Sequence, residues 1–293
     1  MYREYYPNKW PNKWRKGIGK TAIVITIAVV LVLFLLASIF LFPKVAGYFE
    51  RKAIEENNQA ALEEVKDLQE DKEEFVHPKE GIKRVNEMTL ELAATPPIKQ
   101  EPVIVEEKAY LTVPFICQAP HQTEANWVYH EESCEEAALL QVVYYLNGTQ
   151  QVNRQLAHEE IMEMIDWQKK NMGSHHDLYG EEMKEFITGY YGYSDREVTV
   201  ISGATIDDIK KEIAKGNPVI VPIMGHLLRN PYYPYPGYHM LTVIGYTPTN
   251  IITNDVGTRH GKDFSYPYQR FYDAMEAAGA EILVITPKKQ KTT

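Results

Sequence analysis

The stretch that decides the fold is Val113–Gly148, VPFICQAPHQTEANWVYHEESCEEAALLQVVYYLNG. In its second half, apolar residues recur from Leu139 to Leu146 at the i, i+3, i+4, i+7 spacing of an amphipathic helix, and Asn147 and Gly148 supply a C-terminal stop. The sequence therefore predicts a helix that ends near Asn147 and begins close to a cysteine.

Cys134 is predicted to be the first residue of this helix. Ser133 stands at the N-cap position and Glu136 follows three residues later, which is the pattern of a capping box. Backbone N–H groups and the helix dipole favour an anion here, so the pKa of the thiol is expected to fall. The carboxylates of Glu135 and Glu136 oppose this effect unless they face solvent or cations. Cys134 is therefore a candidate nucleophile, and a buried structural thiol is the alternative.

Length, composition and charge narrow the possible classes of protein. The chain has 293 residues, 44% of them hydrophobic, and two cysteines, which allows one sizeable domain with attachments and excludes a disulfide scaffold. The net charge is −9; the first 43 residues hold six positive side chains and one negative, so the remaining chain carries −14. An acidic domain without a basic stripe is not expected to bind nucleic acid.

A single membrane-spanning helix is predicted near the N-terminus. Residues 21–43 form a stretch of 23 residues without a charged side chain. At about 1.5 Å per residue, such a helix exceeds a hydrocarbon core of about 30 Å. A cleaved signal peptide is the alternative, although its apolar region is usually shorter. Residues 1–20 are basic, so the positive-inside rule places this end in the cytoplasm and the main domain outside the cell membrane.

Three further segments follow the predicted span. Residues 44–90 are rich in charged helix formers and are predicted to form a helical stalk. The stalk has only a few apolar residues along one face, so weak self-association as a coiled coil is an open alternative. Residues 91–109 contain three prolines and are predicted to be an extended linker. The folded domain is expected to comprise residues 110–293.

Within that domain, helical patterns come first and strand patterns later. Helices are predicted at 155–169, 179–190 and 205–215, and strands at 218–224, 238–246, 251–254 and 281–286. This order predicts an α+β fold with an antiparallel sheet, in which the helical part carries the cysteine. The loop 227–237 is dense in proline and tyrosine, and it is predicted either to line a substrate cleft or to act as a rigid connector.

His239 is the best-placed base among nine histidines because it stands at the start of a predicted buried strand. If the strands on either side of residues 247–249 pair as a hairpin, Asp255 lies opposite His239 and can accept the second N–H of its imidazole. A register slip of one residue would present Asn254 instead. Alternatively, the histidine only packs in the sheet and the aspartate only ends a strand.

A side-chain amide is a candidate for oxyanion stabilisation. Gln118 lies upstream of Cys134 in an apolar strand. Its amide N–H could act together with the Cys134 backbone N–H, which a helix start leaves without an intrahelical partner. Gln122 is the rival, and a surface role is the alternative for a glutamine.

The motifs VPFICQAP, SCEEAALLQVVYYLNG, GYHMLTVIGY and NDVGTRHG together resemble the double-glycine-leader (bacteriocin-processing) peptidase family in its stand-alone form, which is papain-like. The resemblance covers about residues 110–286. It implies a papain-like cysteine peptidase fold with Cys134 as nucleophile, His239 as base and acid, Asp255 as orienting residue and Gln118 as oxyanion donor. No stretch resembles a phosphate loop, so the ATP-binding part of the family's exporters is not expected in this chain.

Three alternatives to an active peptidase remain open. Cys117 could pair with Cys134 in a disulfide and make the domain inactive or redox-gated. The cleft could bind peptides or cell-wall material without cutting them. His175, His176 and Asp177 could bind a metal, but adjacent histidines point in different directions and a loop is predicted instead. The favoured interpretation is a membrane-anchored extracytoplasmic cysteine peptidase that acts on peptides or proteins without a metal or other cofactor.

Overall fold

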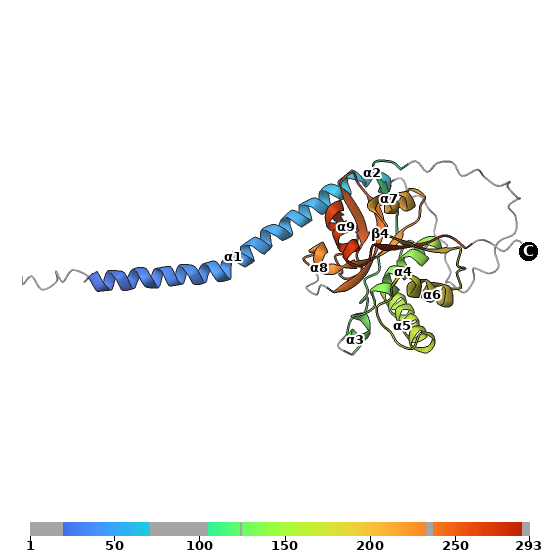
Figure 1. Cartoon of the computed structure of the whole chain (residues 1–293), viewed down its shortest axis with the longest axis horizontal. Helices are drawn as coiled ribbons and strands as arrows, with labels where there is room; N and C mark the ends of the chain where they lie inside the picture. The colour runs from blue at the N-terminus through green and yellow to red at the C-terminus, as the bar shows by residue number, and fades with distance from the viewer. Residues whose placement is uncertain (1–19, 71–104, 124, 233–236, 289–293) are drawn as a thin grey trace, which may run out of the picture. The chain divides into compact units, whose positions relative to one another are not determined.

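The computed structural model describes residues 20–70, 105–123, 125–232 and 237–288, and the chain divides into two compact units, residues 1–55 and 56–293 (Figure 1). In the first unit, the described residues belong to helix α1 (Lys20–Glu64). The membrane-spanning helix was predicted here, at residues 21–43. Among the described residues, however, no helix is both long enough and sufficiently apolar to cross a membrane.

The second unit is built around an antiparallel sheet of seven strands. Six strands follow the order β2-β7-β3-β4-β5-β6, and β1 pairs with β4. The strands are β1 (Ala109–Tyr110), β2 (Val198–Ser202), β3 (Val219–Met224), β4 (Tyr238–Tyr246), β5 (Asn250–Asn254), β6 (Phe264–Pro267) and β7 (Glu281–Ile285). Strand β4 is buried from His239 to Tyr246, so the sheet interior holds the candidate base. The predicted α+β fold with an antiparallel sheet is confirmed.

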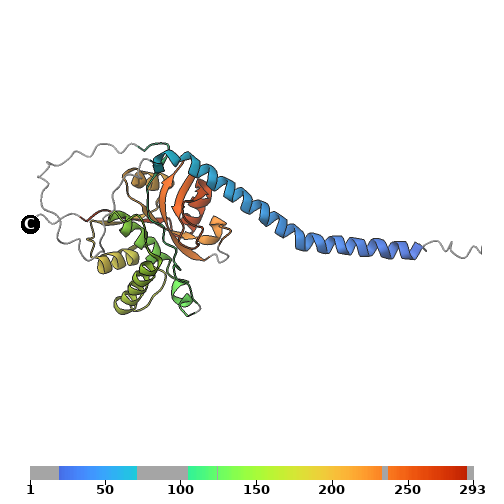
Figure 2. The same ribbon diagram turned by 180° about the vertical axis from the view of Figure 1, so that it is seen from behind.

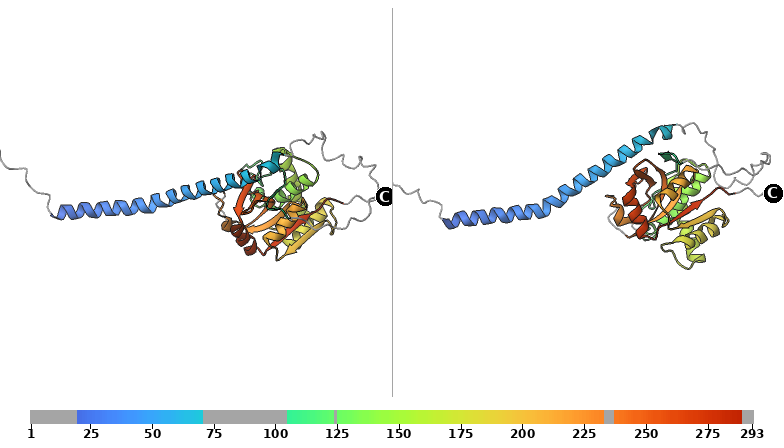
Figure 3. Two further views of the ribbon diagram at one scale, coloured as in Figure 1. Left: turned by 90° about the horizontal axis from the view of Figure 1, so that it is seen from above. Right: turned by 45° about the horizontal axis from the view of Figure 1, so that its top comes forward.

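Figures 1 and 2 show helices on both sides of this sheet, α4 to α6 on one side and α8 and α9 on the other, and Figure 3 gives two further views. The helices of this unit are α2 (Lys66–Glu70), α3 (Trp127–His130), α4 (Cys134–Leu146), α5 (Arg154–Asn171), α6 (Gly180–Tyr191), α7 (Ile206–Ala214), α8 (Gly225–Leu228) and α9 (Tyr268–Ala277). Helix α4 lies against β4, where Thr242 Oγ1 donates to the Ala138 carbonyl at 3.2 Å. This contact brings the helix that begins at Cys134 to the strand that carries His239.

Helix α4 begins at Cys134 as predicted, but the predicted capping box is wrong. The Ser133 hydroxyl makes no cap hydrogen bond and instead donates to the Tyr129 carbonyl at 2.6 Å. The Glu136 side chain is turned into the interior, where it accepts a hydrogen bond from Gln168 Nε2. Tertiary contacts, rather than local capping, therefore set the start of the helix.

The last turns of α1 and helix α2 belong to the same compact unit as the sheet. Ala61 of α1 and Val65, which lies between the two helices, are buried. Asn58 Oδ1 accepts hydrogen bonds from the backbone N–H (3.0 Å) and the hydroxyl (2.8 Å) of Ser265, and Asn57 Nδ2 donates to the same hydroxyl at 3.2 Å. Ser265 lies on β6, the strand at one end of the sheet order. These turns of α1 thus satisfy polar groups of an edge strand that would otherwise be open to pairing.

Candidate active site

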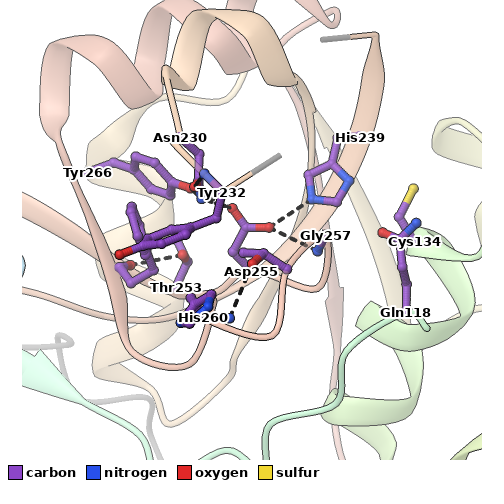
Figure 4. A network of polar contacts seen from close by, with 12 residues as sticks. Gln118, Cys134, Asn230, Tyr232, His239, Thr253, Asp255, Gly257, His260 and Tyr266 are labelled. Atoms are coloured by element: carbon purple, nitrogen blue, oxygen red, sulfur yellow. Dashed lines mark hydrogen bonds and ion pairs between the residues drawn. The ribbon is translucent and has the colours of Figure 1, made fainter. Parts of the chain in front are cut away.

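His239 and Asp255 are hydrogen-bonded to each other. Nε2 of His239 lies 2.9 Å from Oδ1 of Asp255, and the carboxylate is completely buried. Figure 4 shows the other ring nitrogen on the side of the imidazole that faces Cys134. In this geometry a carboxylate orients an imidazole so that the other ring nitrogen can exchange a proton with a nucleophile.

This pair forms although the predicted strand register is wrong. Thr242 lies opposite Asn254 in the β4–β5 pairing, so Asp255 follows the end of β5 instead of lying opposite His239. The predicted register is displaced by two residues at this point, and an even displacement keeps side chains on the same face of a sheet. Asn254, the alternative partner, has another role: its Nδ2 donates to the Val113 carbonyl at 3.0 Å.

Three further donors hold the Asp255 carboxylate. Tyr266 Oη donates to Oδ2 at 2.5 Å, Asn230 Nδ2 donates to Oδ2 at 3.2 Å, and the Gly257 backbone N–H donates to Oδ1 at 3.1 Å (Figure 4). Burial alone would raise the pKa of Asp255, but the hydrogen bonds from His239, Tyr266 and Gly257 lower it below its ordinary value. The carboxylate is therefore ionised and fixed in position before any substrate binds.

The loop that follows Asp255 returns to it at Gly261. The Asp255 N–H donates to the Gly261 carbonyl at 2.8 Å. A Cβ atom at Gly261 would lie 1.8 Å from the Asp255 carbonyl oxygen, which no side chain could tolerate without a backbone shift. Position 261 therefore needs glycine so that the loop can return to the carboxylate.

Cys134 is 5% exposed, and its thiol donates to Oε2 of Glu135 at 3.1 Å. The structure describes no hydrogen bond between this thiol and His239. The backbone N–H of Met240, the next residue along the strand, interacts with the sulfur. Burial, followed by the Glu135 carboxylate, raises the pKa of Cys134 well above its ordinary value. The expectation of a lowered pKa is wrong in this state because these two effects outweigh the helix start.

The two glutamates after Cys134 face the interior rather than solvent, since each is 1% exposed. Glu135 Oε1 accepts the backbone N–H of Leu178 at 3.0 Å. Burial and the nearby Glu136 raise the pKa of Glu135 well above its ordinary value. Glu136 Oε1 lies 3.4 Å from His175 Nε2. The sequence pattern gave no reason to expect that the side chains of Glu135 and Glu136, in the first turn of α4, would be buried.

Gln118 lies between the residues that precede Cys134 and the loop that follows Asp255. Its backbone N–H donates to the Val256 carbonyl at 2.9 Å, and its Nε2 donates to the carbonyls of His130 (2.9 Å) and Glu131 (3.0 Å). The side-chain amide therefore lies close to the residues before α4, and its N–H groups donate to backbone carbonyls there.

Gln122, the rival to Gln118, is exposed. Cys117 and Cys134 are both free thiols, so the disulfide alternative is not found in this structure. Residues 175–177 lie in a loop, as predicted, and among the described residues no group of three or more suitable side chains could hold a metal ion.

Four residues of the site escaped sequence reasoning: Asn230, Gly257, Gly261 and Tyr266. Asn230 belongs to the loop 227–237, whose density of proline and tyrosine was the available signal. Tyr266 lies on β6, which has only four residues and ends in a proline. Such a short strand is not separable from a loop by periodicity.

The chain belongs to the Peptidase C39-like family, whose sequence profile matches residues 110–281. Among solved structures, a protein from Bacillus anthracis whose title describes it as a C39-like peptidase has 16% sequence identity and a TM-score of 0.46, and the alignment covers 63% of this chain and 100% of that one. No curated protein matches the sequence.

Proposed function

We propose that this member of the family is a cysteine peptidase, with Cys134 as the nucleophile, His239 as the base and acid, and Asp255 as the orienting carboxylate. The observation that carries the proposal is the 2.9 Å hydrogen bond between His239 and the buried Asp255. Met240, which follows His239 on strand β4, interacts through its backbone N–H with the sulfur of Cys134. The papain-like resemblance of the sequence supports the same assignment.

In each half of the proposed cycle, His239 accepts one proton and then returns it. The Cys134 proton passes to Nδ1 of His239, and Asp255 stabilises the imidazolium through Nε2. The thiolate attacks the peptide carbonyl, and His239 returns the proton to the leaving amine. Water then attacks the thioester with His239 as base, which releases the second product and restores the thiol.

The negatively charged oxygen of the intermediate needs hydrogen-bond donors. The backbone N–H of Cys134 is the first candidate because it stands at the first position of α4. Gln118 remains the proposed second donor. Its Nε2 now donates to two backbone carbonyls, so this role requires the amide to turn toward the substrate.

The experiment that tests the activity compares the parent protein with Cys134→Ala on a library of internally quenched peptides. We expect cleavage by the parent and no cleavage by the variant, because alanine removes the nucleophile. Cys117→Ala is the matched control, since it removes the other thiol and should leave cleavage intact. Equal cleavage by the parent and Cys134→Ala would refute the assignment.

A second candidate function is a peptide-binding module without turnover. It is favoured by one observation, namely that the thiol is enclosed and bonded to Glu135 instead of His239. In that case the peptide library would bind to the parent protein without being cut. A disulfide-gated form would differ again, because reductant would restore cleavage.

We also propose that the protein is tethered to the membrane with its main domain outside the cytoplasm. This proposal rests on two features of the sequence, the uncharged residues 21–43 and the basic residues before them. Fractionation of cells that express the chain, followed by a carbonate wash and protease treatment of intact cells, tests it. Recovery of the protein in the soluble fraction would contradict the proposal.

A further inference from the structure

Glu135 is a buried carboxylate that the proposed reaction does not use, yet it accepts the hydrogen bond of the nucleophile. Its Oε2 lies 3.1 Å from Cys134 Sγ, and its Oε1 accepts the Leu178 N–H at 3.0 Å. Leu178 and Glu135 are both buried. The carboxylate is therefore fixed on one side by the loop before α6 and bonded on its other side to the thiol.

The groups around Glu135 come from three elements. Helix α4 contributes Cys134 and Glu136, and the loop before α6 contributes Leu178 and Tyr179. Strand β4 contributes Tyr238, whose ring centroid lies 4.4 Å from that of Tyr179 and whose hydroxyl donates to the Leu178 carbonyl at 2.6 Å. The imidazole of His175 also lies near this group, 3.4 Å from Glu136 Oε1. The group within hydrogen-bonding distance of the thiol is nevertheless the Glu135 carboxylate.

We propose that Glu135 is a positioning residue that holds Cys134 as an unreactive thiol in the resting protein, and that breaking the Cys134–Glu135 hydrogen bond is the step that admits the nucleophile to catalysis. This inference rests on the proposed function. The inference goes beyond the proposed function because it explains why Cys134 is unreactive in the resting protein. The restraint comes from the side chain of the next residue in the sequence, Glu135, rather than from a separate inhibitory segment.

The step is a side-chain rotation followed by a proton transfer. The S–H···O bond to Glu135 breaks, and the sulfur turns toward His239 on the adjacent strand. The S–H proton passes to Nδ1 of His239, which leaves a thiolate and an imidazolium, while Glu135 keeps its own protonation state and its bond to Leu178. No oxidant or other reactant is required.

The test is the rate at which iodoacetamide alkylates Cys134 in the full chain as a function of pH, followed by mass spectrometry of the modified peptide. Cys117 is read in the same spectra as an internal reference. In Glu135→Gln the amide can still accept from Leu178 but carries no charge. We expect alkylation of Cys134 at pH 7 to rise about tenfold, because the carboxylate that accepts the S–H hydrogen bond is gone.

Glu181→Gln is the matched control, because Glu181 occupies the second position of α6 as Glu135 does in α4, but its side chain is 80% exposed. This variant should alkylate like the parent protein. Unchanged alkylation in Glu135→Gln would overturn the inference, and so would a parent Cys134 that reacts at pH 7 as fast as a free thiol. The latter measurement needs no variant, so the inference stays testable if Glu135→Gln does not fold.

Failure of the inference and failure of the proposed function give different results. If the parent cuts peptides and Glu135→Gln does not change the alkylation profile, the peptidase stands and the restraint is refuted. If alkylation rises in Glu135→Gln but neither protein cuts any peptide, the restraint stands and the peptidase is refuted. If the peptidase activity and the restraint by Glu135 are both correct, the acidic limb of the pH profile for cleavage should lie at lower pH in Glu135→Gln than in the parent protein.

Discussion

Nε2 of His239 is 2.9 Å from the Oδ1 atom of Asp255, a carboxylate with no exposed surface. Replacing Asp255 by alanine should lower kcat/KM about 10²- to 10⁴-fold, because the imidazole loses the group that orients it and stabilises its charged form. Iodoacetamide should still alkylate Cys134. Asp273→Ala, an exposed aspartate on α9, is the control. Near-normal cleavage by Asp255→Ala would exclude Asp255 from the reaction.

Tyr266→Phe removes the hydroxyl that donates to Asp255 Oδ2 and accepts from Asn230 Nδ2 at 2.8 Å. We expect a loss of about 1.5–3 kcal/mol in the free energy of unfolding, the range for hydrogen bonds to charged groups, and a Tm lowered by about 2–4 °C for each kcal/mol. Thermal denaturation measures this loss. Tyr272→Phe, in which the hydroxyl contacts Glu276 on the exposed side of α9, should change the Tm little. An equal effect of the two substitutions would contradict a special role for Tyr266.

Gly261→Ala should destabilise the protein by about 3 kcal/mol or more, because the new methyl group overlaps the Asp255 carbonyl and the loop must shift. Chemical denaturation measures the loss. Gly237→Ala is the control, since a Cβ atom there meets no described residue within 4 Å. If both variants unfold at the same denaturant concentration, the close approach at Gly261 is not tight in solution.

The pKa of Glu135 gives a prediction for stability against pH. Its folded-state pKa is raised, mainly by burial, so between the unfolded-state pKa and the folded-state pKa the native state binds more protons than the unfolded state. Stability from this group is therefore present at low pH and is lost as the pH rises through that window. The free energy of unfolding should fall more steeply with pH above about 4.5 in the parent than in Glu135→Gln. Parallel profiles would show that Glu135 does not titrate abnormally.

Asn58→Ala tests the packing of α1 on the edge strand. The substitution leaves the part-buried Ser265 N–H without its acceptor, and we expect a loss of about 1–3 kcal/mol. Gln59→Ala replaces the next residue, which is exposed, and should be nearly neutral. Thermal denaturation of the two full-length variants gives the comparison. A neutral Asn58→Ala would mean that the edge strand does not depend on this helix.

Periodicity was sufficient to predict the helix and the strand that carry the candidate residues Cys134 and His239. Helix α4 starts at Cys134, and the strand pattern at 238–246 agrees with β4. Asp255 was identified through a register that was wrong by two residues, and the assignment survived because an even shift preserves the face. The local pattern around His239 was therefore more informative than the exact pairing.

What the sequence could not predict are the interactions that depend on burial. The sequence left open whether Glu135 and Glu136 face solvent, and the packing of α4 against the loop before α6 encloses them. Ser133 has the right spacing for a cap, but a competing acceptor at Tyr129 takes its hydroxyl. Residue type and spacing do not determine which of several nearby hydrogen-bond partners a side chain binds in the folded protein.

Tyr266, which anchors the Asp255 carboxylate, comes from β6, at one margin of the sheet order. Marginal strands fray before central ones, so heat or mild denaturant should release this phenol while α4 and β4 remain folded. Inactivation should then precede global melting, and the β6 amides should exchange their hydrogens sooner than those of β4.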